Sequence, residues 1–263
     1  MNFEHIVYTK ENGVATIKFN RPKSFNSLDL DTSCEFVAAV EKCTEDVDVR
    51  SVIITGEGKA FCSGGDIAYF KKFLETAPSE PFRDVMKYLN LAIIGIRRMP
   101  KPVIAAVNGA AGGAGMSVAA ACDLRICAAS AKFRQAYTGI GMVGDEGWTL
   151  FVPLLIGFGR TMELLLLDPI FDAKQALEWG LVTQVVEDEK LKDTTLEIAA
   201  KLAQGPTKAY AIAKENLNRS MMANLESQLE LERIGMMAAS RTEDYVEGVR
   251  AFLEKRKPVF KGR

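Results

Sequence analysis

Short apolar runs alternate with amphipathic segments over the first two thirds of the chain. These runs have the length and content of paired or buried strands, and they are Val7–Tyr8, Val14–Phe19, Ser51–Thr55, Val103–Val107 and Leu124–Ala128. Leu28–Cys43 and Phe82–Arg98 instead place apolar residues at helical spacing between polar ones. Strands that alternate with helices predict an α/β layer structure with crossover connections.

The last part of the chain has a different pattern. It consists almost entirely of helix formers, which predict helices over Leu191–Leu202, Pro206–Asn216, Leu225–Ala239 and Asp244–Lys255. We therefore expect two parts, an α/β core over residues 1–200 and a helical region over residues 201–263. Because so short a helical region cannot bury a large core by itself, it should pack on the α/β part or on another subunit.

Charge and apolarity exclude two classes of partner. Lys plus Arg is 33 and Asp plus Glu is 34, so the basic excess of a nucleic-acid-binding protein is missing and we expect no such partner. Pro102–Cys122 carries no charge over a length that could span a membrane. It is mostly Ala and Gly with Asn108 inside, which is too weakly apolar, so we expect no membrane partner and interpret it as a buried strand and a tightly packed helix.

Cysteine and histidine usage narrows the chemistry further. The five cysteines are odd in number and no pair has CxxC spacing, which argues against a disulfide framework and a zinc site. Together with the lack of a secretory signal pattern at the start, this predicts a cytoplasmic protein. His5 is the only histidine, so a Ser-His-Asp or Cys-His nucleophile and a His-ligated metal are not expected. No Rossmann or P-loop glycine pattern follows a strand.

Two glycine-rich segments follow predicted strands and lead into helix patterns. Gly58–Ile67 follows the Ser51–Thr55 strand, and Asn108–Met116 follows the Val103–Val107 strand. Small residues let a ligand approach the backbone, and a helix N-terminus supplies free N–H groups. Two such turns side by side can form an oxyanion hole. Each turn taken alone is better explained by close packing of a helix on a strand, whereas the two together favour a site.

Several of these segments together resemble a known family, the crotonase or enoyl-CoA hydratase/isomerase superfamily. The matching segments are NRPKSFNSL (20–28), GKAFCSGGDI (58–67), KPVIAAVNGAAGGAG (101–115), CDLRICAASAKF (122–133), AKQALEWGLV (173–182) and EDYVEGVRAFLEKRKPVFKG (243–262). The C-terminal half resembles in particular the enoyl-CoA isomerases of bacterial phenylacetate degradation. The resemblance implies an α/β, crotonase-like spiral of ββα turns with a C-terminal helical trimerisation region. It also implies a homotrimer or a dimer of trimers.

The resemblance also implies positions for substrate binding. Position by position, the oxyanion donors match the N–H groups of Gly65 and Ala114. The residues implied to contact coenzyme A are Lys23, Phe25, Ser63, Gly64, Asp66 and Ile67, with Phe252 and Lys255 where a neighbouring subunit touches it in the family. Coenzyme A is then part of the acyl-CoA substrate, and no separate cofactor and no metal are expected.

The acidic positions of the family decide which reaction is implied. Hydratases use two glutamates around one water, and those positions are here Ser117 and Tyr137. Isomerase branches place an acid slightly later, where this chain has Asp145. Glu146 is the second candidate for that acid, and Asp145 could instead cap the following helix. Trp148 stands where a small residue is common and is expected to reshape the acyl pocket.

We therefore expect an enoyl-CoA isomerase that moves a double bond from the 3- to the 2-position through a thioester dienolate, with one aspartate as base. An enoyl-CoA hydratase remains an alternative if Asp145 and Tyr137 substitute for the missing glutamates. A non-catalytic acyl-CoA-binding partner subunit is the alternative outside enzymes. The dehalogenase branch is not favoured, because Phe82–Arg98 lacks its helix histidine.

Overall fold

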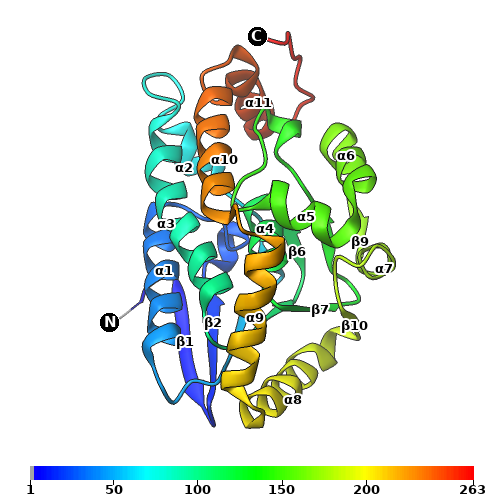
Figure 1. The fold of residues 1–263 in the computed structure, drawn as a ribbon. Coiled ribbons are helices and arrows are strands. Elements are labelled where there is room, and N and C mark those ends of the chain that lie inside the picture. Colours follow the sequence, from blue (N-terminus) through cyan, green and yellow to red (C-terminus); the bar gives the residue numbers. More distant parts are fainter. Residues whose placement is uncertain (1–2) are drawn as a thin grey trace.

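In the computed structural model, which describes residues 3–263, two sheets form a spiral of ββα turns (Figure 1). The larger sheet has the strand order β1 (Ile6–Glu11), β2 (Val14–Phe19), β3 (Ser51–Gly56), β5 (Val103–Val107), β7 (Leu124–Ala128) and β10 (Gln184–Val186). The smaller sheet has the order β4 (Ala60–Cys62), β6 (Ala110–Gly112), β8 (Lys132–Arg134) and β9 (Phe171–Asp172). The pairs β3/β4, β5/β6 and β7/β8 each give one strand to each sheet, so the α/β spiral expected from the sequence is confirmed.

Pairing in the large sheet explains its apolar strands. β1 and β2 are antiparallel, whereas β2, β3, β5, β7 and β10 run parallel. Parallel strands need crossovers that cover both faces, so their residues are buried on both sides. Successive side chains point to opposite faces, and Ile53, Ile104 and Ile126 accordingly pack with Leu191 and Ala199 of α8 (Leu191–Gln204).

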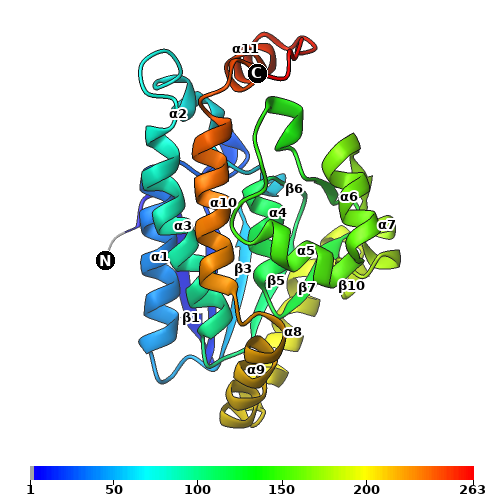
Figure 2. The same ribbon diagram turned by 45° about the horizontal axis from the view of Figure 1, so that its top comes forward.

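The opposite face of the sheet carries the main core and the other large helices. These are α1 (Leu30–Glu45), α3 (Glu80–Arg98), α4 (Ala114–Ala121) and α10 (Leu225–Ala239). Figures 1 and 2 both show α10 alongside α3, which in turn packs on α1. The Phe82–Arg98 helix pattern thus lies inside α3, and the Leu225–Ala239 pattern coincides with α10.

The remaining helices surround this core. They are α2 (Ile67–Lys71), α5 (Trp148–Ile156), α6 (Phe158–Leu167), α7 (Ala173–Glu178), α9 (Thr207–Met221) and α11 (Glu243–Glu254), with short 3-10 helices η1 (Pro22–Ser24), η2 (Thr138–Ile140) and η3 (Asp188–Lys190). α11 packs on η2 and α2 of its own chain. Within residues 3–263, no helix combines the length and the apolarity that a membrane crossing needs.

Close packing fixes α4 against the strand before it. A Cβ atom built on Gly115, in the first turn of α4, would lie 2.1 Å from the carbonyl oxygen of Cys62 in β4. Any side chain there would push the helix off the strand, since packed interiors have no room for an extra methyl group. The glycine-rich pattern after β6 therefore serves packing as well as ligand approach, and it holds the N-terminus of α4 next to the end of β4.

Candidate active site

A cavity of about 560 Å³ collects most of the residues that the sequence predicts for a site. Its walls come from the ends of β4 and β6, from α3, from the 134–146 segment and from α11. One part is apolar and is lined by Phe70, Phe82, Val85, Met86, Leu89 and Met142. The polar part holds Gly65, Ala114, Tyr137, Asp145 and Glu146. A mostly apolar cavity with a few converging polar groups is the usual form of a small-molecule site.

The two glycine-rich turns meet at this cavity, as an oxyanion hole requires. Gly64 has a positive φ of 98°, and a Cβ atom on it would lie 2.8 Å from the Gly112 carbonyl oxygen and 3.4 Å from the Ala114 nitrogen. Only a glycine fits this contact between the turns. Two backbone hydrogen bonds hold the turn at residue 65. The N–H of Leu28 donates to the Gly64 carbonyl oxygen, and the Leu28 carbonyl oxygen accepts from the N–H of Asp66.

Two backbone N–H groups remain available at the cavity. Within the described chain, neither Gly65 nor Ala114 donates its N–H to another protein group. Ala114 is the first residue of α4, where intrahelical acceptors are lacking and the helix dipole favours negative charge. The pair can therefore hold an oxygen atom that gains negative charge during a reaction.

A buried hydrogen-bond chain holds Asp145 beside these donors. The Tyr137 hydroxyl donates to Asp145 Oδ1 over 2.5 Å, and Ser117 Oγ, on α4, donates to the Asp145 carbonyl oxygen over 2.9 Å. The two hydroxyl oxygens are 3.0 Å apart. Tyr137 also lies against the oxyanion turn, because its Cε1 is 3.7 Å from where a Gly113 Cβ would be. Ser117 and Tyr137, which stand where hydratases have their two glutamates, thus hold Asp145 in place.

Burial changes the proton affinity of this aspartate. Asp145 is 7% exposed, and burial raises the pKa of its carboxyl, while hydrogen bonds from Glu146 and Tyr137 lower it in part. A raised pKa makes the carboxylate a stronger base at neutral pH. Burial and the neighbouring carboxyls raise the pKa of Tyr137 well above its usual value, so this residue stays a hydrogen-bond donor.

Glu146 is also at the cavity, in an unusual environment. The residue is fully buried and has a φ of 50°, in the left-handed region that costs a non-glycine residue about 1–2 kcal/mol. Burial and the Asp145 carboxyl raise the pKa of Glu146 well above its ordinary value. The environment of Glu146 thus favours its protonated form, next to the Asp145 carboxyl.

Glu232, which the sequence analysis missed, fixes the turn that carries both acids. From α10, its carboxylate accepts from the N–H groups of Gly147 over 2.7 Å and Thr149 over 2.9 Å, and from the Thr149 hydroxyl. It thereby satisfies the N-terminus of α5, so Asp145 is not the cap that the sequence left open. Sequence offers no signal for this contact, since a glutamate inside an amphipathic helix is normally exposed.

We expect Glu232→Gln to destabilise the protein by about 1–3 kcal/mol. The amide has one acceptor oxygen, whereas the two carboxylate oxygens accept separately from Gly147 and from Thr149. Burial raises the pKa of Glu232 to about 7, so the measurement belongs at a pH above this value, where the carboxylate is formed. Urea unfolding followed by circular dichroism measures the difference. Glu230→Gln, an exposed change on the same helix, is the matched control and should leave the unfolding midpoint in place. Equal midpoints for both variants would contradict this role of Glu232.

The structure places the predicted coenzyme A contacts in two groups. Those at the cavity are Phe25, Ser63, Gly64, Asp66, Ile67 and Phe252. Phe252 reaches it from α11 of the same chain, whereas the resemblance implied a neighbouring subunit. Asp66 also has a structural role, because it caps α2 through the Tyr69 N–H and pairs with Arg21. The polar residues at the mouth of the cavity further include Arg134, Arg256 and Lys257, which the sequence analysis did not select.

The other group lies outside the cavity lining. Lys23 is an exposed residue of η1, and Lys255 ends α11 with a left-handed backbone. Trp148 is buried behind Tyr137, with the rings edge to face and their centroids 6.4 Å apart. Trp148 is not part of the cavity lining, so it could reshape the acyl pocket only through the residues that it supports. Its indole instead supports the tyrosine that holds Asp145.

Comparison with known proteins identifies the family. A sequence model of the enoyl-CoA hydratase/isomerase family matches residues 9–263. The chain belongs to this family. A 1,2-epoxyphenylacetyl-CoA isomerase of Escherichia coli K12 is 38% identical over 99% of both chains, and a crotonyl-CoA hydratase of Syntrophomonas wolfei is 36% identical over 99% of both. The crystal structure of an enoyl-CoA hydratase from Mycobacterium avium subsp. paratuberculosis K-10 has a TM-score of 0.90 and 32% identity, covering 99% of this chain and all of that one.

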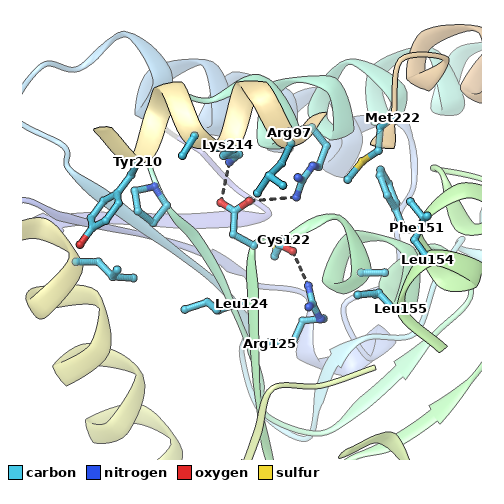
Figure 3. Close-up of a pocket in the computed structure, with 16 residues that line it drawn as sticks. Arg97, Cys122, Leu124, Arg125, Phe151, Leu154, Leu155, Tyr210, Lys214 and Met222 are labelled. Carbon is cyan, nitrogen blue, oxygen red and sulfur yellow. Dashed lines mark hydrogen bonds and ion pairs between the residues drawn. The ribbon is translucent and has the colours of Figure 1, made fainter. Parts of the chain in front are cut away.

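This member of the enoyl-CoA hydratase/isomerase family has a second cavity, of about 450 Å³, at the C-terminal end of α4 (Figure 3). Arg97 and Lys214 both bind the Asp123 carboxylate there, at 3.1 and 2.7 Å, and Arg125 donates to the Cys122 carbonyl. The rest of the lining is mainly apolar, including Leu154, Leu155 and Phe151. Because its one carboxylate is neutralised by two cations, this cavity offers no base comparable to Asp145.

Proposed function

We propose that the chain is an enoyl-CoA isomerase that converts a 3-enoyl-CoA into a 2-enoyl-CoA. The observation that supports this most is the Asp145 carboxyl, buried at the cavity beside the unbonded N–H groups of Gly65 and Ala114. The enzyme family is common to hydratases and isomerases, and this arrangement of one positioned base and two oxyanion donors favours the isomerase.

The proposed chemistry follows from the acidity of a thioester. The carbon next to a thioester carbonyl loses a proton when the oxygen can take the negative charge. The Gly65 and Ala114 N–H groups would bind that oxygen as the dienolate forms. Asp145 would take the proton from C2, and a proton then returns at C4 to give the conjugated product. No histidine, metal or added cofactor enters this scheme, and coenzyme A is part of the substrate.

The cavity also suits an acyl-CoA substrate. The cationic side chains of Arg134, Arg256 and Lys257 at the mouth would lie near the phosphates of coenzyme A. Phe25 would offer an aromatic face to its adenine ring. The apolar end, with Phe82 and Met86, would take the acyl chain. The similarity to the 1,2-epoxyphenylacetyl-CoA isomerase of Escherichia coli supports a ring-derived acyl group among the substrates of this chain.

A hydratase is the second candidate, and one observation favours it. Glu146 adds a second carboxyl to the cavity, and water addition uses two acid–base groups. A paired assay separates the two candidates. We expect a purified sample to convert a 3-enoyl-CoA with a rise in conjugated-thioester absorbance, and to leave a 2-enoyl-CoA unhydrated. Loss of absorbance from the 2-enoyl-CoA with formation of 3-hydroxyacyl-CoA, and no conversion of the 3-enoyl-CoA, would establish the hydratase instead.

We also propose that the protein assembles as a homotrimer or as a dimer of trimers. Exposed apolar side chains on the outer helices support an assembly, and they are Phe158, Leu166, Leu167, Ile212, Leu217, Leu231 and Ile234. Single exposed apolar residues are ordinary on a protein surface, but two or more on each of α6, α9 and α10 favour an interface.

A further inference from the structure

Glu146 has no donor for either of its carboxylate oxygens. Both oxygens are buried, and within residues 3–263 no N–H or O–H group of a fixed donor reaches them. The group in hydrogen-bonding reach is the Asp145 carboxyl, which accepts but does not donate when it is ionised. One proton placed between the two carboxyls gives each side a partner. A shared proton therefore gives one of the two Glu146 oxygens a hydrogen-bond partner that a pair of carboxylates lacks.

The surroundings of Glu146 favour that proton. The titratable groups that face it are Asp145 on the same turn, Glu232 from α10, Tyr137 and the Cys62 thiol from β4. The two carboxyls disfavour a negative charge at Glu146, whereas burial keeps the thiol protonated. Burial of Glu146 itself acts in the same direction as the two carboxyls. The Glu232 contacts hold the turn that carries Glu146, and the side chain of Glu146 is fully buried at the cavity.

We propose that Glu146 is a second proton-transferring residue of the isomerase: it delivers the proton to C4 of the acyl chain, while Asp145 accepts the one that leaves C2. This inference rests on the isomerase function proposed above. Two positions on an acyl chain would then be served by two carboxyls instead of one that must move between them.

The transfer balances without any other reactant. The C2–H bond breaks, its proton goes to Asp145, and its electron pair forms the dienolate whose oxygen is bound by Gly65 and Ala114. Electrons of the dienolate then form the C4–H bond with the proton of Glu146, which becomes a carboxylate. Asp145 passes its new proton across to Glu146, and both groups return to their starting states.

An isotope experiment distinguishes this from transfer by a single base. A 3-enoyl-CoA with deuterium at both C2 positions is converted in ordinary water under single-turnover conditions, and deuterium at C4 of the product is measured by mass spectrometry and NMR. A single base returns the deuterium it removed to C4 of the same molecule. In the proposed scheme the first proton at C4 comes from Glu146, so the wild-type product should carry little deuterium there.

Glu146→Gln is the decisive variant, because the amide keeps the size of the side chain but cannot deliver a proton. Asp145 must then serve both carbons, so we expect deuterium at C4 to rise several-fold and kcat to fall about tenfold, less than the 10²–10⁴-fold of losing all acid–base catalysis. Glu146→Ala should give the same isotope pattern and covers the case in which the Gln variant does not fold. Circular dichroism and thermal unfolding verify the fold of both.

The possible outcomes separate this inference from the proposed function. Retention of deuterium at C4 in the wild type would overturn it, and so would equal deuterium at C4 in the wild type and both variants. In either case conversion of the 3-enoyl-CoA by wild type would leave the isomerase in place. A wild type that does not convert the 3-enoyl-CoA at all would remove the proposed function, and the role of Glu146 with it.

Discussion

Asparagine in place of Asp145 should abolish the conversion of a 3-enoyl-CoA, with kcat reduced about 10²–10⁴-fold, the usual contribution of a positioned acid–base group. The amide has the shape of the carboxyl, and its oxygen can still accept the hydrogen bond that Tyr137 donates to Asp145 Oδ1. The backbone contact from Ser117 is unaffected, because it uses the carbonyl oxygen of residue 145. The loss would therefore report the missing base and not a displaced turn.

The measurement is the rate of rise in conjugated-thioester absorbance, with binding of a non-reactive acyl-CoA measured in parallel. We expect binding to change little, since in the proposed scheme Asp145 would act on the reacting carbon atoms and not on the coenzyme A part. Asp188→Asn, a change in an aspartate outside both cavities, is the matched control and should keep wild-type activity. An Asp145→Asn protein that still isomerises at the wild-type rate would transfer the role of base to another group, with Glu146 the first candidate.

How much of this structure the sequence predicts depends on how local the determining contacts are. The strands Val103–Val107 and Leu124–Ala128 have the predicted bounds, because continuous apolar runs between turn residues define a buried parallel strand. The helix at Ala114 follows a glycine turn and was also expected. In contrast, β9, β10 and the short strands of the second sheet are two or three residues long and leave no periodic pattern.

The candidate site likewise has some residues that local sequence patterns predict and others that only the folded structure brings together. Gly65, Ala114 and Asp145 could be assigned from motifs, since each lies in a segment with a recognisable local pattern. The partners that set their chemistry come from far along the chain. Ser117 and Tyr137 are twenty residues apart and meet through the fold, and Glu232 is more than eighty residues from the turn it holds. Long-range contacts of this kind have no sequence signature without a structure.

The environment of Glu146 shows the limit of motif reading most clearly. From its position in the sequence, Glu146 is only a second candidate for the acid at Asp145. The buried oxygens without donors and the left-handed backbone are properties of the folded turn. Local conformations that cost free energy persist where the rest of the fold holds them, and they occur preferentially at functional sites. That is the physical basis for assigning Glu146 a role of its own.

Proline in place of Ala114 should lower kcat about 10²–10³-fold, the effect of losing one oxyanion-hole donor. Ala114 is the first residue of α4, where proline is tolerated because that position has no intrahelical acceptor for its N–H. Its N–H makes no hydrogen bond within the described residues, so removing it should cost the folded state little. The preceding Gly113 has a φ of 49° and a ψ of −129°, outside the α region that a following proline disfavours.

Steady-state kinetics with a 3-enoyl-CoA and thermal unfolding test this prediction together. Ala114→Gly keeps the N–H group and is the matched control, so its kcat should stay near that of wild type. The proline ring also occupies space next to the thioester oxygen, so part of the loss would appear as a raised KM. A folded Ala114→Pro protein with wild-type kcat would show that the dienolate oxygen is not held at α4. The role assigned to the two glycine-rich turns would then have to be given up, because Gly65 alone supplies a single donor.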